Sequence, residues 1–270
     1  IMVKNGKVTG VRLENGEEIN ADRVVSNLDA RKTFLGMMDP KDAGEKVVKA
    51  AKRYKSRGSS GKLNIALNGV PEFTALPKGS ELIKGDFHIV DNMEAYERGY
   101  DEWKDGKWST HPYLDLLIPT LTDPTMAPPG KHFMTCFVQY CPSRVEGKDW
   151  TPELLKKFGD NVLDNIAKYS PNFKDLIEHV EIRSGQVIDN EIGLTEGNIF
   201  QGELSLNQLM FNRPFHGCAQ YRGPVNGLYL SGSTTHPGGG VMGAPGANSA
   251  REILIDMNIS TTVPEDEGDD

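Results

Sequence analysis

The sequence is poor in cysteine, in net positive charge and in long apolar runs. Three cysteines in 270 residues, without metal-ligand spacing, exclude a disulfide-stapled fold and a zinc-binding module. The formal net charge of −8 argues against nucleic acid as the main partner, because phosphate backbones call for basic faces. No apolar run approaches the roughly 20 residues that span a bilayer, and the N-terminal residues lack a signal-peptide pattern. We therefore expect a soluble intracellular protein, cytoplasmic, or mitochondrial if the source is a eukaryote.

Two of the cysteines, Cys136 and Cys141, are spaced like the redox pair of disulfide reductases. The surrounding sequence, HFMTCFVQYC, predicts a β-strand, in which residues five apart point to opposite faces and lie about 16 Å apart. A disulfide needs Cα atoms within about 7 Å of each other. Strand geometry therefore favours a structural role for this pair over a redox role.

The most informative segment is GLYLSGSTTHPGGGVMGAPGANSA, residues 227–250. Its first part, Leu228–Leu230, predicts a short interior strand. The glycines that follow let the main chain approach a ligand closely or take positive φ, and they stand at positions 238, 239, 240, 243 and 246. From about Val241 to Ile255 the pattern is helical, and the free N–H groups at a helix start attract anions. A loop tightened only for packing is the alternative.

A literal G-x-G-x-x-G match, formed by Gly238, Gly240 and Gly243, is not a dinucleotide fingerprint. The true fingerprint follows its strand directly and opens a βαβ unit. Only 27 residues follow Gly243, and they end in an acidic stretch, so no returning strand fits after it. We expect instead a glycine-rich loop that closes a sheet built mostly from earlier sequence.

The first thirty residues predict a three-stranded meander and a fourth strand. Asn-Gly pairs at 5–6 and 15–16 suit two-residue hairpin turns. Residues 21–26 form the strand that follows. The next polar residues, Asn27 and Asp29, either face a ligand crevice or cap the helix expected at 30–38, and we favour the cap.

Further elements are expected along the middle of the chain. The expected strands are Lys62–Leu67, Leu114–Pro119 and Phe133–Tyr140. The clearest helix, Thr151–Tyr169, has Thr151 as N-cap and an apolar residue at every fourth position. A shorter helix is expected at Asn172–His179, followed by irregular sequence to Gly202.

A basic amphipathic helix is expected within residues 41–57, where seven Lys or Arg residues stand against Asp42 and Glu45. Such a helix can rest on an anionic membrane. Its apolar stripe is thin, so we favour a solvated surface helix, with peripheral membrane contact as the alternative.

Three stretches of the chain carry a family resemblance. The first two are VTGVRLENGEEINADRVVSNLDA, residues 8–30, and GLYLSGSTTHPGGGVMGAPGANSAREIL, residues 227–254. They resemble the hairpin with its following strand, and the C-terminal flavin motif, in the C-terminal half of FAD-dependent oxidoreductases of the phytoene desaturase and amine oxidase superfamily. The third, GLTEGNIFQGELSLNQLMFNRP, residues 193–214, narrows the resemblance to the subgroup named pyridine nucleotide-disulfide oxidoreductase domain-containing protein 2.

The resemblance implies an α/β fold with a partial, discontinuous FAD-binding domain, formed by residues 1–30 and 218–258. An α+β substrate domain of mixed sheet and helices, residues 31–217, is expected as an insertion. By composition, residues 259–270 are expected to be a disordered acidic tail.

The same resemblance assigns the cofactor contacts. Gly232 and Ser233 are expected to approach the phosphate and ribityl portion of FAD. The residues expected to run past the isoalloxazine and its ribityl chain are Gly239, Gly240, Val241, Met242 and Gly243. The helix start that follows would stabilise negative charge on a reduced flavin.

Few residues outside the glycines are candidates for a catalytic or substrate-binding role. His236 is a candidate catalytic acid or base, with a structural histidine hydrogen-bonded to the loop as the alternative. Arg213 and Tyr221 are candidates for the substrate pocket, and ordinary surface ion pairing is the alternative for Arg213 and Arg222. No metal site is expected.

The resemblance implies hydride abstraction or desaturation of an apolar or isoprenoid-like substrate. Amine oxidation and a non-catalytic interaction protein are the alternatives. The family's N-terminal strand, its G-x-G-x-x-G turn and its acidic ribose ligand are not in this sequence. We therefore expect a preceding segment or a partner chain to complete the FAD site, and self-association through an exposed apolar patch.

Overall fold

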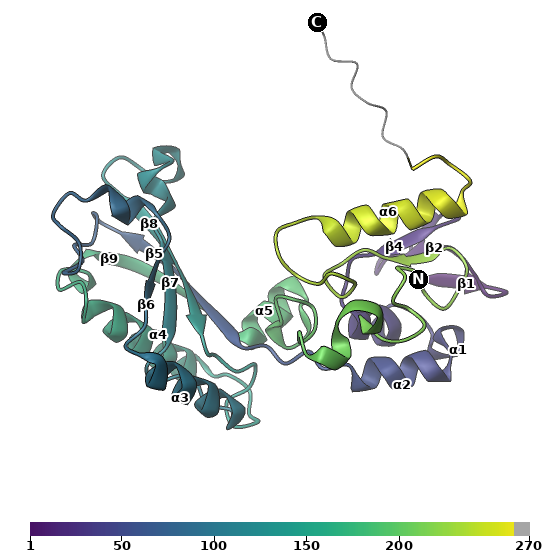
Figure 1. The fold of residues 1–270 in the computed structure, drawn as a ribbon, viewed down its shortest axis with the longest axis horizontal. Helices are drawn as coiled ribbons and strands as arrows, with labels where there is room; N and C mark the ends of the chain where they lie inside the picture. Colours follow the sequence, from purple (N-terminus) through teal and green to yellow (C-terminus); the bar gives the residue numbers. More distant parts are fainter. Residues whose placement is uncertain (262–270) are drawn as a thin grey trace, which may run out of the picture. The chain divides into compact units, whose positions relative to one another are not determined.

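The computed structural model describes residues 1–261, which form two compact units (Figure 1). Unit 1 comprises Ile1–Ser56 and the described residues from Ile199 onward, and unit 2 comprises Arg57–Asn198. Residues 31–56 and 199–217, which the sequence assigned to the substrate domain, pack within unit 1. The assignment of cofactor and substrate roles to the two parts stays a prediction. The predicted acidic tail lies, from residue 262 on, outside the described residues.

Unit 1 contains two small sheets. The first is the predicted antiparallel meander of β1 (Met2–Lys4), β2 (Lys7–Arg12) and β3 (Glu18–Asn20). The second pairs β4 (Val24–Ser26) in parallel with β10 (Leu228–Leu230). Two segments from opposite ends of the sequence are therefore hydrogen-bonded neighbours.

The helices of unit 1 surround these sheets. They are a π-helical turn (Lys32–Gly36), α1 (Pro40–Ala43), α2 (Glu45–Arg53), the 3-10 turns Leu206–Gln208 and Met210–Asn212, and α6 (Ala244–Asp256). The expected basic helix is interrupted at Gly44, whose φ of 81° lies in the left-handed region that favours glycine. Asp29 Oδ1 accepts a hydrogen bond from the Lys32 N–H at 2.9 Å, which confirms the favoured capping role.

Unit 2 is built on one antiparallel sheet with the strand order β6-β7-β8-β5-β9. Its strands are β5 (Ser60–Leu67), β6 (Phe87–Ile89), β7 (Tyr113–Leu117), β8 (His132–Gln139) and β9 (Ile177–Arg183). The predicted helix is confirmed as α4 (Pro152–Ala167), with the Thr151 hydroxyl accepting from the Leu154 N–H. Phe158, Val162 and Ile166 of α4 are fully buried in one cluster with the inward-facing strand residues. The fold as a whole is mixed α/β.

Three features of unit 2 differ from the sequence-based expectation. The helix expected at Asn172–His179 is wrong, because a 3-10 turn (Lys174–Leu176) leads there into β9. The irregular stretch expected up to Gly202 is also wrong, since β9 extends to Arg183 and α5 (Gly185–Ile192) follows it. Helix α3 (Met93–Lys104) and strand β6 were not expected. In β9, pairing with β5 supplies backbone hydrogen bonds that outweigh local helix propensity.

The three cysteines are free and buried. Burial raises the pKa of Cys141 and of Cys218 to about 12, so both thiols stay protonated at neutral pH. This agrees with a structural role.

Candidate functional site

The candidate site lies where the carboxyl ends of β4 and β10 meet. The chain leaves β10 into the glycine-rich loop of residues 231–243, which ends at α6. Gln201 links both strand ends, since its side-chain amide donates to the Asn27 carbonyl at 2.8 Å and accepts from the Thr234 N–H at 3.1 Å. The Ala30 N–H donates to the Thr234 hydroxyl at 3.2 Å. The carboxyl ends of the two parallel strands, the position at which α/β proteins commonly bind ligands, are thus held together by three separate segments.

Two glycines of the loop are required by protein packing. A Cβ on Gly232 would lie 2.3 Å from the Asn27 carbonyl oxygen, and one on Gly239 would lie 2.2 Å from the Phe200 ring. Neither space can hold even a methyl group. For these two positions, tight packing is a sufficient reason for glycine.

The later glycines face open space. A Cβ on Gly243 or Gly246 would have no heavy atom within 4 Å, and one on Gly240 would meet only the mobile end of the Met242 side chain. Val241 is fully exposed, and Met242 is 55% exposed. Residues 240–243 and Gly246 are therefore exposed main chain and apolar side chains, whereas Pro245 between them is buried.

The start of α6 adds a polar feature to this surface. Gly243 has a φ of 66° at the N-cap position, and its carbonyl accepts the Ala247 N–H at 3.1 Å. The N–H groups of Ala244 and Gly246 precede this first helical bond, so they point out of the helix end. Together with the helix dipole they favour an anionic group.

Arg213 fixes the position of the glycine-rich loop through hydrogen bonds. Its side chain is fully buried, and its guanidinium donates to five main-chain carbonyls. The accepting carbonyls belong to Phe200, Gly202, Glu203, Gln208 and Ser233. Burial lowers the pKa of Arg213 from its ordinary value, but a guanidinium remains charged at any physiological pH. Surface ion pairing is therefore wrong for Arg213, and its expected contact with substrate stays a prediction.

Surface ion pairing is correct for Arg222. Its guanidinium lies 2.8 Å from Asp256 on α6 and also pairs with Glu252. Hydrogen bonds from Arg222 and from Tyr229 lower the pKa of Asp256 to about 2. These contacts attach α6 to the segment that precedes β10.

Tyr221 and His236 are brought together. The Tyr221 hydroxyl donates to the His236 carbonyl at 2.9 Å and accepts from the Asn248 side chain of α6 at 2.9 Å. The His236 Nδ1 is buried and has no hydrogen-bond partner among the described residues. Tyr221 thus fixes the position of the loop, whereas the His236 Nδ1 is left buried without a hydrogen bond.

All the predicted cofactor residues therefore lie in one loop, in which main-chain carbonyls accept hydrogen bonds from Arg213 and Tyr221. Sequence reasoning missed Phe200, Gln201 and Asn248. The signal for the first two was present in the Gly193–Pro214 stretch, which carried the resemblance but received no structural role.

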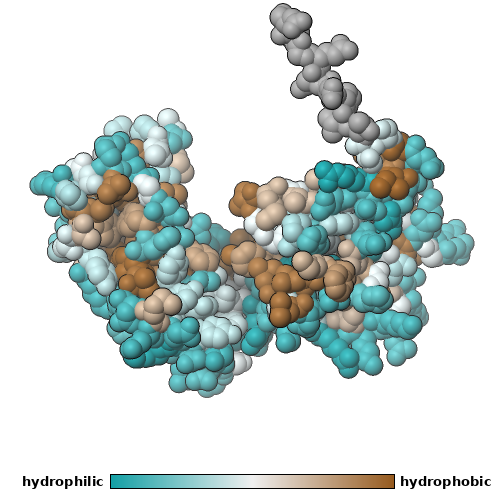
Figure 2. Space-filling model, viewed as in Figure 1, coloured by the Kyte–Doolittle hydropathy of each residue, from teal (hydrophilic) through white to brown (hydrophobic). Residues whose placement is uncertain are grey.

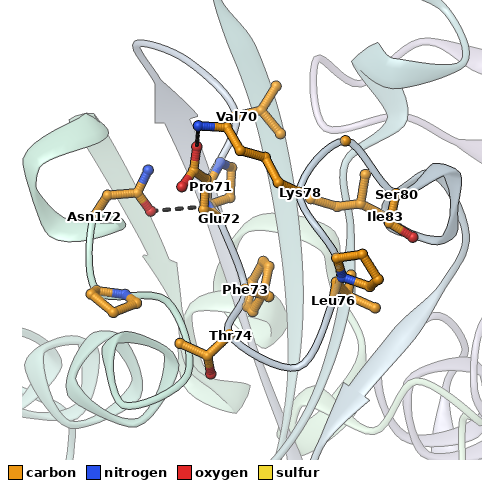
Figure 3. Close-up of a pocket in the computed structure, with 13 residues that line it drawn as sticks. Val70, Pro71, Glu72, Phe73, Thr74, Leu76, Lys78, Ser80, Ile83 and Asn172 are labelled. Carbon is orange, nitrogen blue, oxygen red and sulfur yellow. Dashed lines mark hydrogen bonds and ion pairs between the residues drawn. The ribbon is translucent and has the colours of Figure 1, made fainter.

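Unit 2 contains a separate cavity of about 640 Å³ (Figure 3). Its lining is mainly apolar, with Val70, Pro71, Phe73, Leu76, Pro77, Ile83 and Pro171. At the rim, the Lys78 ammonium lies 3.5 Å from Glu72, whose N–H donates to the Asn172 side chain at 2.9 Å. A cavity of this size and lining suits a small apolar molecule.

One group in the described part of unit 2 has metal-ligand spacing. Ligand atoms of Asp86, His88 and Asp115 all lie within 4.8 Å of one another. Burial, followed by the hydrogen bond from Asp86, raises the pKa of Asp115. The His88 Nε2 lies 3.9 Å from Asp86 and 3.7 Å from Asp115, so the three side chains form one polar cluster.

Helices that could cross a membrane are absent from residues 1–261, since none combines sufficient length with sufficient apolar character.

Comparisons with known proteins place these features in context. No family model matches the chain. The chain is 35% identical over 263 residues to pyridine nucleotide-disulfide oxidoreductase domain-containing protein 2 of Rattus norvegicus, covering 93% of this chain and 45% of that protein. It is 30% identical over 244 residues to phytoene desaturase of Phycomyces blakesleeanus, covering 88% of this chain and 39% of that enzyme. The predicted family relationship is confirmed.

The chain spans about half the length of the curated relatives that it matches. Among solved structures, an oxidoreductase from Methanosarcina mazei has a similar fold, with a TM-score of 0.53 and 17% identity. That match covers 95% of this chain and 47% of the other. At this identity the likeness concerns the fold alone.

Proposed function

We propose that the chain forms part of an FAD-dependent oxidoreductase and that its glycine-rich loop lies against the flavin. The observation that carries the proposal is the exposed surface of residues 240–243 and Gly246, in the segment that follows the carboxyl end of β10. The relationship to phytoene desaturase supports the same cofactor. In this proposal the FAD domain is discontinuous, and its remaining part lies outside the 270 residues.

The residues present fit one part of a flavin site. Gly240, Gly243 and Gly246 leave room for main-chain contact with a flat ring, and Val241 and Met242 offer apolar contact. The start of α6 would stabilise negative charge near the ring. Arg213 and Tyr221 act as positioning residues, because both bond to main-chain carbonyls of this loop.

Hydride abstraction is the chemistry that FAD supplies when bound. The proton released from the substrate needs an acceptor, and His236 is the titratable side chain within the glycine-rich loop of residues 231–243. We assign His236 as the candidate base on this ground.

The substrate class that we propose is apolar. The support comes from the unit 2 cavity, whose walls are formed mainly by Pro, Leu, Ile, Val and Phe side chains. This cavity lies within residues 31–217, the predicted substrate domain. Leu76→Asp would place a charge in the apolar wall and should weaken binding of a fluorescent apolar probe, whereas exposed Leu82→Asp should leave it unchanged.

The absorption spectrum of the complete gene product tests the cofactor. Flavin bands in the purified protein are expected. A correctly folded, colourless product that fails to bind added FAD would contradict the proposal and favour a non-catalytic interaction protein.

A substitution at Gly246 tests the place of the flavin. Gly246 is exposed, a Cβ there has open space beyond its own helix, and leucine improves helix propensity by up to about 1 kcal/mol, so stability should be kept. If the flavin lies against this surface, Gly246→Leu should abolish FAD binding. Gly36→Leu is the matched control, because Gly36 also faces open space, in the π-helical turn. Equal FAD content in the two variants would place the cofactor elsewhere.

A further inference from the structure

Unit 1 exposes large apolar side chains within one short loop, residues 204–211. Leu206 is 91% exposed, Phe211 75%, Met210 62% and Leu204 47%. Figure 2 shows hydrophobic residues gathered on the visible face of this unit. Single exposed apolar residues are common on protein surfaces, whereas four within eight residues mark an interaction surface.

A basic surface adjoins this loop. Lys46, Lys49 and Arg53 of α2 stand three and four residues apart, on one face of the helix, and line a hollow of about 430 Å³. Asn207 and Phe215 line the same hollow, and no acidic residue is among the described residues that line it. Asn207 and Gln208 belong to the apolar loop, so the loop adjoins the cations of α2.

The loop is held in place rather than loosely attached. The Lys55 N–H donates to the Gln208 side chain at 2.7 Å, and the Gln208 amide donates back to the Lys55 carbonyl at 3.0 Å. Gln208 itself is buried, while its neighbour Leu206 is almost fully exposed. The fold thus fixes the loop beside the end of α2 and directs its apolar side chains outward.

We propose that this surface, the α2 cations together with residues 204–211, docks unit 1 on an anionic lipid membrane. Charge complementarity selects this occupant, because the surface is basic in a chain of net charge −8. The sequence favoured a solvated helix because the apolar stripe of α2 is thin. In the structure, the stripe residues Val47, Val48 and Ala51 pack in the core of unit 1, and the neighbouring loop supplies the apolar contact that α2 lacks.

Co-sedimentation with vesicles tests the proposal. Wild-type chain should bind vesicles of phosphatidylcholine mixed with phosphatidylserine, bind pure phosphatidylcholine weakly, and dissociate at high salt. Replacing Lys46, Lys49 and Arg53 together by Gln should lower the affinity by about fivefold per cation. Leu206→Ser with Phe211→Ser should lower it at least about tenfold.

Matched controls separate docking from general surface effects. Lys62, Lys107 and Lys157 are exposed cations of unit 2, and Leu82 and Met93 are 70% and 73% exposed there. Replacing these residues in the same ways should leave vesicle binding unchanged. Circular dichroism of every variant checks that it is folded.

Two outcomes would overturn the proposal. One is wild-type chain that stays in the supernatant with anionic vesicles, or variants that bind as wild type does. The other is a dimer that Leu206→Ser with Phe211→Ser converts to monomer without any vesicle binding, which would make a second copy the occupant. The readout is independent of FAD, so failure here leaves the proposed function intact.

Discussion

The guanidinium of Arg213 donates twice to the main-chain carbonyl of Ser233, from Nε at 2.9 Å and from Nη2 at 2.7 Å. The remaining donors reach the carbonyls of residues 200–208. One fully buried side chain therefore connects the stretch before the candidate site to the loop that forms it. These hydrogen bonds are charge-assisted and diverge from one planar group, which favours a guanidinium over any other side chain.

Arg213→Met should destabilise the chain by about 3 kcal/mol, because several buried carbonyls would lose their donors. Arg213→Lys should rescue only part of the loss, since one ammonium group cannot donate both to the Ser233 carbonyl and to the carbonyls of residues 200–208. Urea unfolding measures both. Arg222→Met, which breaks half-exposed ion pairs, should cost at most about 1 kcal/mol. Equal losses at the two arginines would contradict the importance of the buried contacts.

Gly239→Ala should cost about 1–3 kcal/mol, because the new methyl group would overlap the Phe200 ring. The cost should be smaller in a chain that carries Phe200→Ala, where the ring is gone. A double-mutant cycle by chemical denaturation measures this coupling. Additive losses would mean that Gly239 is required for another reason, such as contact with a ligand.

Asp256→Asn should lower stability at neutral pH, and the difference from wild type should vanish in acid. The pKa of Asp256 in the folded chain is about 2, lowered by Arg222 and then Tyr229, against an ordinary value of 3.8. A lowered carboxyl pKa stabilises the fold above the unfolded value, and this contribution is lost as pH falls from 3.8 toward 2. Thermal melts of both proteins across this range measure it. A difference that is independent of pH would contradict the assignment.

All three thiols should be unreactive toward a disulfide reagent in the native chain and should react together on unfolding. Their burial removes access, and raised pKa values for Cys141 and Cys218 remove the thiolate that would attack. A thiol count with a coloured disulfide reagent, with and without denaturant, checks this. Rapid native reaction of two thiols would revive a redox role for Cys136 and Cys141.

Elements that depend on neighbouring residues were predicted well from the sequence. The helix α4 is signalled by its Thr151 cap, its first-turn proline and its apolar spacing, all within one segment. The meander is signalled by Asn5-Gly6, which forms the predicted two-residue turn, whereas Asn15-Gly16 lies in a longer connection, residues 13–17, so a two-residue turn is wrong there. In both, the interactions that select the structure join residues close along the chain.

Strand β9 shows where this approach fails. Its residues Ile177, Val180 and Ile182 are β-branched, which is a weak strand signal, and the hydrogen bonds that fix the strand come from β5, far earlier in the sequence. A segment whose partner is distant takes the structure that satisfies its backbone groups in the fold.

The candidate site divides in the same way. Its glycines, its strand and its helix start are properties of residues 227–250, so the sequence alone determined that a glycine-rich loop joins a strand to a helix start. Only the tertiary structure decided which glycines pack against protein atoms and which face open space. It also decided that Arg213 is buried and bonded to main-chain carbonyls, and is not a surface charge. The physical reason is that turns and caps draw their energy from adjacent residues, whereas close packing and buried hydrogen bonds require partners that only folding brings together.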